Sequence, residues 1–197
     1  VHGGATLNEK DYLTNEAAME EKIAVNTENK TAIAKYAALQ IADDDFIYID
    51  AGTTTMLIAD YITAKNISIV TNGIAHAKKF AAKGFKTIVL GGLLKASTEA
   101  IVGLTAADSI KKYNFNKAFI GTNGISKDLG YTTPDSDEAF LKKAAIENSF
   151  VSYILGDSSK LNKVSRITFA KLEQAVLITD RLSDNAYKDL TDVREVL

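Results

Sequence analysis

Six short apolar segments separated by helical segments are the feature that most constrains the fold of this chain. Each is continuously apolar and of strand length, which is typical of strands buried on both faces of a parallel sheet. The intervening stretches have helical patterns, and a further helix with Asn26 or Thr27 as its cap is predicted before the first strand. We therefore predict an α/β fold: an open, mostly parallel sheet with helices on both faces. The predicted strands are 46–50, 67–71, 86–90, 117–121, 150–155 and 175–179, and the predicted helices between them are 54–63, 73–83, 104–113 and 135–149.

The composition is that of one globular domain with a sizeable core: 197 residues, 46% hydrophobic and 24% charged. The net charge is -2 and the basic residues are scattered, so the chain lacks the basic surface that nucleic-acid binding requires. The apolar runs are far shorter than the roughly 20 residues of a membrane span, which predicts a soluble protein. The absence of cysteine and of a basic-then-apolar leader fits a cytoplasmic location.

The residues after the first strand predict a phosphate-binding loop. The sequence Asp50-Ala51-Gly52-Thr53-Thr54-Thr55 ends a buried strand and opens a helix. The first amides of a helix have no partner within it, and three threonine hydroxyls add donors, so a sugar phosphate or a nucleotide is the favoured guest. The alternative is that Thr53 or Thr54 only caps the helix and Asp50 only satisfies a turn.

Similar loops follow the other strands. Ligands of open α/β sheets bind at the carboxyl ends of the strands, where these loops meet. Five small, polar or glycine-rich loops at one edge favour a site for a phosphate-bearing small molecule. No Gly-x-Gly-x-x-Gly follows a strand and no Gly-Lys-Ser or Gly-Lys-Thr is present, which argues against dinucleotides and nucleoside triphosphates. The loops are 50–55, 71–73, 91–92, 121–124 and 157–160.

Four charged residues are candidates for ligand contacts. Lys160 follows two serines at a strand exit and could reach a phosphate, or could be a solvated surface lysine. Asp135 and Glu138 have the spacing of a helix capping box, yet with Lys142 one turn later they also place charged groups on one helical face near the edge of the sheet. These groups could therefore bind sugar hydroxyls or serve the helix alone.

The two histidines, His2 and His76, lie far apart and have no cysteine or acidic residue at metal-ligand spacing. We expect both to be ordinary surface residues, and we expect no metal site and no cofactor.

A set of motifs, taken together and in order, resembles the DeoR family of bacterial sugar-operon repressors. In that family an N-terminal winged helix-turn-helix binds operator DNA and leads into a segment like the one that opens this chain. The resemblance implies that residues 1–20 are an arm following an absent DNA-binding domain, and that 21–197 form an effector-sensing domain. The motifs are Val1-His2-Gly3-Gly4-Ala5, Asp50-Ala51-Gly52-Thr53-Thr54, Thr71-Asn72-Gly73, Gly91-Gly92, Gly121-x-Asn123-Gly124-Ile125, Thr132-Thr133-Pro134-Asp135-x-x-Glu138-Ala139 and Asp157-Ser158-Ser159-Lys160.

The resemblance also implies a fold like ribose-5-phosphate isomerase, glucosamine-6-phosphate deaminase and the CoA transferases, used for sensing rather than catalysis. A phosphorylated sugar is the implied effector, and operator DNA is a partner only through the absent domain. The implied phosphate ligands are Gly52, Thr53, Thr54, Thr55 and Lys160. The implied sugar contacts are Asp50, Thr71, Asn72, Asn123, Asp135, Glu138 and Lys142, and the loop glycines Gly91, Gly92 and Gly124 complete the predicted site.

Within the family, residues 95–103 and the Thr-Thr-Pro-Asp stretch look most like regulators of fructose operons. Fructose 1-phosphate is therefore the first effector to consider, followed by a tagatose phosphate or another ketose or hexose phosphate. The resemblance further suggests a homodimer or homotetramer, with Ile101, Val102 and Leu104 as possible contact residues.

Two other functions stay open. The chain could be an isomerase or deaminase in which Asp135 or Glu138 abstracts a proton next to a carbonyl. Against this, the sequence lacks a glycine-rich run of the isomerase kind followed by an acidic residue, and we expect no histidine near the loops. The chain could also be an oligomerisation module whose loops no longer bind a ligand.

Overall fold

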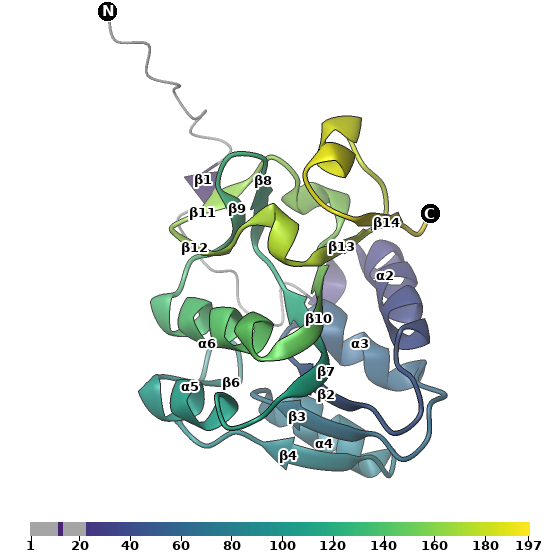
Figure 1. Cartoon of the computed structure of the whole chain (residues 1–197), viewed down its shortest axis with the longest axis vertical. Helices are drawn as coiled ribbons and strands as arrows, with labels where there is room; N and C mark the ends of the chain where they lie inside the picture. Colours follow the sequence, from purple (N-terminus) through teal and green to yellow (C-terminus); the bar gives the residue numbers. More distant parts are fainter. Residues whose placement is uncertain (1–11, 14–22) are drawn as a thin grey trace, which may run out of the picture.

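A seven-stranded sheet forms the centre of the computed structural model, which describes residues 12–13 and 23–197 (Figure 1). Every neighbouring pair in this sheet is parallel, so the predicted α/β class is confirmed. In spatial order the strands are β14 (Val193–Glu195), β13 (Val176–Thr179), β10 (Ser149–Leu155), β7 (Phe115–Gly121), β2 (Phe46–Ile49), β3 (Ser68–Thr71) and β4 (Lys86–Val89).

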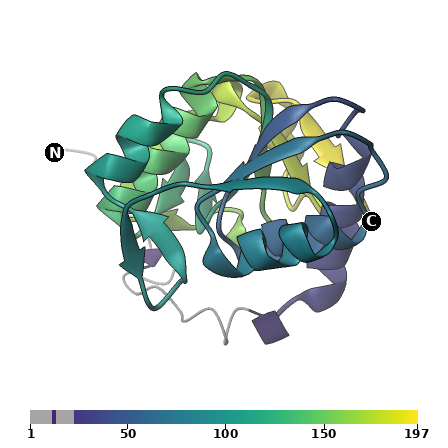
Figure 2. The same cartoon turned by 90° about the horizontal axis from the view of Figure 1, so that it is seen from below.

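Helices cover both faces of the sheet, as predicted (Figure 2). One layer contains α2 (Thr27–Leu39), α3 (Thr53–Leu57) with the 3-10 turn η2 (Ile58–Asp60), and α4 (Ile74–Ala82). The other contains α5 (Leu104–Ile110) and α6 (Ser136–Glu147). The predicted helix 54–63 is shorter than expected, because it tightens into the 3-10 turn after Leu57.

Alternate residues of the central strands pack on opposite faces of the sheet. In β2, Ile47 and Ile49 pack in a core with α2, whereas Tyr48 packs in a second core with α5 and α6. The same division separates Ile69 from Val70 in β3. Both faces bury apolar surface, which explains why the strands carry continuous apolar runs.

Several short strands lie outside the main sheet and were not predicted. A three-stranded antiparallel sheet contains β12 (Ile167–Ala170), β9 (Gly130–Thr133) and β8 (Gly124–Ser126), and a hairpin contains β5 (Leu93–Lys95) and β6 (Ala100–Val102). β1 (Tyr12–Leu13) pairs in parallel with β11 (Val164–Ser165). These strands have two to four residues, too few for a period to show in the sequence. The predicted arm, 1–20, lies outside the described residues apart from β1.

The apolar residues beside Gly103 divide between the core and the surface. Ile101 and Val102 are 7% and 3% exposed, so the prediction that they could form a contact between copies is wrong. Leu104 is 81% exposed. Within the part of the chain that the structure describes, no helix is long and apolar enough to cross a membrane.

Phe119 should carry a large share of the stability of the core. It is fully buried and its ring stacks on Tyr153 at 5.2 Å between centroids. We expect Phe119→Ala to lower the free energy of unfolding by about 3–5 kcal/mol in urea titrations. Phe150→Ala is the matched control, because Phe150 is 84% exposed, and it should change this energy by less than about 0.5 kcal/mol. Equal losses in the two variants would contradict the assignment of the core.

Candidate functional site

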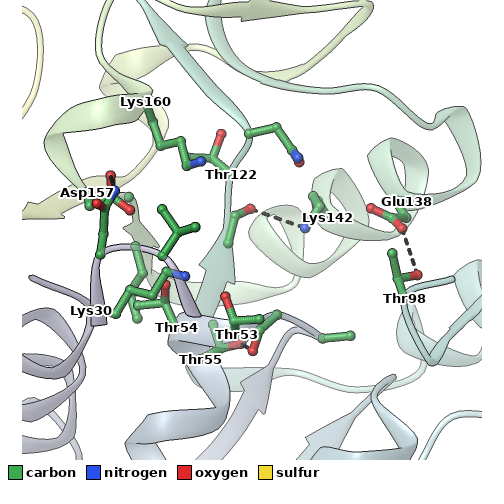
Figure 3. A pocket seen from close by; sticks show the side chains of 18 residues that line it. Lys30, Thr53, Thr54, Thr55, Thr98, Thr122, Glu138, Lys142, Asp157 and Lys160 are labelled. Carbon is green, nitrogen blue, oxygen red and sulfur yellow. Dashed lines mark hydrogen bonds between the residues drawn. The ribbon is translucent and has the colours of Figure 1, made fainter. Parts of the chain in front are cut away.

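A cavity of about 340 Å³ lies at the carboxyl ends of the central strands. Its wall is built from the loops that follow β2, β7 and β10, together with the start of α2, the inner face of α6 and the hairpin β5–β6 (Figure 3). This is the edge at which open α/β sheets bind ligands. The lining residues are Val25, Asn26, Lys30, Ala51, Gly52, Thr53, Thr54, Thr55, Thr98, Gly121, Thr122, Asn123, Glu138, Lys142, Leu155, Gly156, Asp157 and Lys160.

The loop after β2 presents threonine side chains to this cavity. Gly52 is the cap of α3, and neither Thr53 nor Thr54 caps it, so the capping alternative is wrong. Thr53 and Thr54 are half-buried in the cavity wall. Thr55 is fully buried, and its hydroxyl lies 2.6 Å from the carbonyl oxygen of Asp50, to which it donates. Thr55 therefore holds the loop, while Thr53 and Thr54 face the space a ligand would occupy.

Three lysines bring positive charge to the cavity. Lys30 comes from α2, Lys142 from α6 and Lys160 from the 3-10 turn η3 (Ser158–Lys160), and Figure 3 shows Lys30 and Lys160 extending toward the same space. Lys30 and Lys142 are only 6% and 4% exposed. The sequence analysis missed Lys30. A signal was present, since Lys30 precedes Ile33 and Ala34 by three and four residues and so lies on the apolar face of its helix.

Asp50 and Lys142 form a buried ion pair beneath the cavity. Lys142 Nζ donates to Asp50 Oδ2 and also to the carbonyl oxygen of Gly121 at 3.1 Å. The Gly121 amide donates to Asp50 Oδ2 at 3.1 Å. Burial raises the pKa of Asp50, and the charge of Lys142 opposes that rise. Asp50, expected to contact the sugar, thus supports Lys142 and is absent from the cavity wall.

Glu138 faces the cavity beside the hairpin. Asp135 caps α6, because its Oδ1 accepts a hydrogen bond from the Glu138 amide at 3.0 Å, so the capping role predicted for Asp135 is confirmed, whereas the Glu138 side chain lines the cavity. Lys95 donates to Asp135 at 2.8 Å and to Glu138 at 3.0 Å, and Thr98 donates to Glu138 at 3.3 Å. Burial would raise the pKa of Asp135, but the hydrogen bond from Lys95 holds it below its usual range.

Thr71 and Asn72 support the loop from below and do not line the cavity. The Asn72 side-chain oxygen accepts hydrogen bonds from Tyr48 Oη at 3.0 Å and from the Ala51 amide at 2.8 Å. Thr71 Oγ1 accepts from the Gly73 amide at 3.1 Å. Two of the backbone amides after β2 are therefore already satisfied by side chains, that of Ala51 by Asn72 and that of Gly52 by His76 Nε2 at 3.2 Å, while the cavity beside Thr53 and Thr54 stays open.

The predicted glycines Gly91, Gly92 and Gly124 also lie outside the cavity wall. Gly124 is required by close packing, because a Cβ atom there would lie 2.5 Å from the carbonyl oxygen of Lys163. At Gly92, where φ is +156, a Cβ atom would lie 2.7 Å from the carbonyl oxygen of Val102. At both positions glycine allows another backbone segment to pack closely.

The prediction that His76 is an ordinary surface residue is wrong, and so is the expectation that no histidine lies near the loops. His76 is 1% exposed, and its Nε2 lies 3.1 Å from Thr55 Oγ1 and 3.0 Å from the Gly52 carbonyl oxygen. Burial lowers the pKa of His76 to about 4, so it is neutral at pH 7. Its position four residues before Phe80, on the apolar face of α4, was the missed signal. His2 lies outside the described residues.

The structure thus brings about half of the predicted residues into one cavity wall. They are Gly52, Thr53, Thr54, Thr55, Asn123, Glu138, Lys142 and Lys160. Asp50, Thr71, Asn72 and Asp135 lie behind or beside the wall. Among residues 12–13 and 23–197, no group of three or more His, Cys, Asp or Glu side chains is arranged to hold a metal ion.

Comparison with known proteins identifies the family. The DeoR C terminal sensor domain matches residues 25–181. The chain belongs to this family. It is 39% identical to the "Uncharacterized HTH-type transcriptional regulator FruR" of Bacillus subtilis (strain 168), over all of this chain and 79% of that protein. It is 30% identical to the lactose phosphotransferase system repressor of Streptococcus mutans, again over all of this chain and 79% of that protein. The predicted resemblance to DeoR-type regulators is confirmed.

A solved structure confirms the predicted fold. Ribose 5 phosphate isomerase A from Neisseria gonorrhoeae superposes with a TM-score of 0.50 at 15% sequence identity. The alignment covers 70% of this chain and 54% of that chain, so the chain matches about half of the isomerase.

His76 should make stability depend on pH. The unfolded chain binds a proton at the ordinary imidazole pKa of about 6.5, whereas the folded chain binds it only near pH 4. Between these values the unfolded state holds more protons, so the free energy of unfolding should fall as the pH falls, by up to about 3 kcal/mol from this group. Urea titrations from pH 7 to pH 4.5 should show a smaller fall for His76→Gln. Identical pH slopes for both proteins would argue against a buried neutral imidazole.

Lys142 should be essential for stability because its removal leaves Asp50 buried without a counter-charge. We expect Lys142→Met to lower the free energy of unfolding by about 3–5 kcal/mol. The adjacent Lys143 gives a matched control, since its side chain is 62% exposed and its partner Glu147 is 3.8 Å away. Lys143→Met should change stability by less than about 0.5 kcal/mol. Adding Asp50→Asn to Lys142→Met should recover part of the loss, and no recovery would sink the ion-pair explanation.

Proposed function

We propose that this chain is the sugar-phosphate-sensing domain of a DeoR-type transcriptional repressor and is not an enzyme. The observation that carries the proposal is the distribution of charge in one cavity. Lys30 and Lys160 lie at the end of the cavity formed by Thr53 and Thr54, where they outnumber the one carboxylate there, that of Asp157, whereas Glu138 lies toward the other end beside Thr98 (Figure 3). A cationic end suits a phosphate dianion, and a carboxylate with hydroxyl groups suits sugar hydroxyls.

The phosphate would lie against Thr53, Thr54 and the ammonium groups of Lys30 and Lys160. At 4 Å and an effective dielectric constant of 20, one opposite charge attracts by about 4 kcal/mol before desolvation is counted. Two half-buried or buried lysines can therefore offset the cost of removing a phosphate from water. The cavity volume of about 340 Å³ lies at the lower end of the range for small-molecule sites, which suits a ligand of this size.

The sugar would lie toward Asn123, Glu138 and Lys142. Fructose 1-phosphate remains the first effector to test, and the name of the Bacillus subtilis relative supports it. The Streptococcus mutans relative represses a lactose phosphotransferase system, which keeps a tagatose phosphate or another hexose phosphate in the panel.

A sensing role is supported over catalysis by how the polar groups are already paired. Glu138 accepts hydrogen bonds from Lys95 and Thr98, so it is a poorly prepared base. His76 lies behind Thr55, outside the cavity wall. The relatives described above are named as transcriptional regulators or repressors.

Operator DNA would be bound by a domain that precedes this chain, as the resemblance implies, and the assembly would be a homodimer or homotetramer. Effector and operator would then be thermodynamically linked. If the effector weakens operator binding tenfold, the operator weakens effector binding tenfold, a coupling of about 1.4 kcal/mol.

Calorimetry with sugar phosphates tests the proposal. The panel is fructose 1-phosphate, fructose 6-phosphate, tagatose 6-phosphate and glucose 6-phosphate, each beside its free sugar. We expect at least one phosphate to bind and its free sugar to bind at least about tenfold more weakly, because the lysines act on the phosphate. Lys160→Gln should weaken that binding by about tenfold or more, equivalent to about 1.4 kcal/mol.

The control is Lys171→Gln, because the Lys171 side chain is 77% exposed and outside the cavity wall. It should leave the affinity unchanged. Free sugars that bind as tightly as their phosphates would reject the phosphate site. Conversion of the bound phosphate into another sugar phosphate during the titration would favour the isomerase alternative.

A further inference from the structure

The start of α2 and the loop after β10 are joined by side-chain hydrogen bonds beside the cavity. Asn26 Nδ2 donates to Asp157 Oδ1 at 3.1 Å and to Ser159 Oγ at 3.3 Å. Ser159 in turn donates to Asp157 through its hydroxyl and, at 3.0 Å, through its amide. Asn26 and Asp157 both line the cavity, so a ligand would contact this junction directly.

A second junction joins the same two elements one turn further along. Asp180 is 1% exposed, and its Oδ2 accepts hydrogen bonds from Asn29 Nδ2 at 2.7 Å and from Ser158 Oγ at 2.8 Å. Asp180 therefore ties the first turn of α2 to the loop after β10. Because all these groups already have partners, the two elements should move as one unit unless a ligand replaces a partner.

The loop also continues directly to the point where an N-terminal strand is attached. Four residues beyond Lys160, β11 begins at Val164 and pairs in parallel with β1, with Tyr12 opposite Val164. Figure 1 shows β1 beside β11, at the side of the molecule away from β4. Val164 is 4% exposed, and the Ser165 amide donates to Thr132 Oγ1 at 2.9 Å, so β11 packs between β1 and the body of the domain.

Both ends of the described N-terminal region are thus attached to one short segment, 157–165. β1 pairs with its last two residues, and Asn26 is bonded to its first residue and to Ser159. Lys160, which points into the cavity, lies between these two attachments. A ligand that displaces Lys160 or Asp157 would act on both at once.

We propose that segment 157–165 is a relay that couples occupancy of the cavity to the position of the N-terminal strand β1. This inference rests on the proposed sugar-phosphate site. A phosphate beside Asn26 offers its amide an acceptor that competes with Asp157, and its negative charge repels the Asp157 carboxylate while it attracts Lys160. The Asn26–Asp157 hydrogen bond breaks, Lys160 moves toward the ligand while Asp157 moves away from it, and this change within segment 157–165 alters the pairing of β11 with β1.

Amide hydrogen exchange tests the relay in the whole 197-residue chain. The probe is whichever phosphate of the calorimetric panel binds, used at a concentration that saturates each protein. We expect the ligand to change the exchange rates of the amides at 12–13 and 164–165 at least twofold. In Asn26→Ala the junction is already broken, so the difference between bound and unbound protein at these amides should disappear even though the variant is saturated.

Asn148→Ala is the matched control, because Asn148 loses a comparable hydrogen bond, to the carbonyl oxygen of Ala144 at 2.8 Å, away from the relay. It should retain the full ligand-induced change. Binding without any change at 12–13 and 164–165, or an undiminished change in Asn26→Ala, overturns the relay and leaves the sensing function intact. Failure of every phosphate in the panel to bind overturns the proposed function and the relay together.

Discussion

The buried ion pair of Asp50 with Lys142 holds the site together, because it joins three elements that the chain builds far apart. Asp50 ends β2, Lys142 belongs to α6, and both bond the backbone of Gly121 at the end of β7. Both groups are buried, so a displaced charge would be left without a partner and without water. Separating the pair is therefore costly, whichever element moves. The pair thus fixes α6 against the sheet edge, and with it the position of Glu138 in the cavity wall.

The sequence predicted the sheet, its parallel character and the edge that carries the loops, since these follow from continuous apolar runs and the residues that end them. It failed at Asp50 and Asn72 for a physical reason. A polar residue after a buried strand either faces a ligand or satisfies neighbouring backbone, and only the fold shows which partner is closer. Asn72 turned out to hold Tyr48 and the Ala51 amide. Lys30 and His76 were missed because the sequence does not show what a polar residue on the apolar face of a helix contacts. Its role becomes clear only when the neighbouring elements are known.

The polar groups behind the cavity wall explain why the loop after β2 can leave open the cavity in which we propose that an anion binds. Thr55 and His76 bond to each other and to the backbone of the loop, and Asn72 holds Ala51. Buried hydrogen bonds of this kind fix a loop without filling it, because each buried donor and acceptor already has a partner. The half-buried hydroxyls of Thr53 and Thr54 are then left facing the space between Lys30 and Lys160, preorganised rather than assembled by the ligand.

The hydrogen bonds already made within the cavity wall also favour regulation over turnover. A catalytic base must be held near a reacting atom with a proton affinity matched to its task, whereas Glu138 is already hydrogen-bonded to Lys95 and Thr98 of the β5–β6 hairpin. A sensor has the opposite requirement: its contacts must change when the ligand arrives, and a ligand can shift an equilibrium only by its differential affinity for the two states. Asn26 and Glu138 already have protein partners, so in the proposed site they would supply that difference, because each bond to the ligand would replace a bond within the protein. Replacing one hydrogen bond within the protein by one to the ligand changes the free energy only slightly. A total coupling of about 1–3 kcal/mol is nevertheless enough for an effector to change the affinity of a distant site several-fold to about a hundredfold.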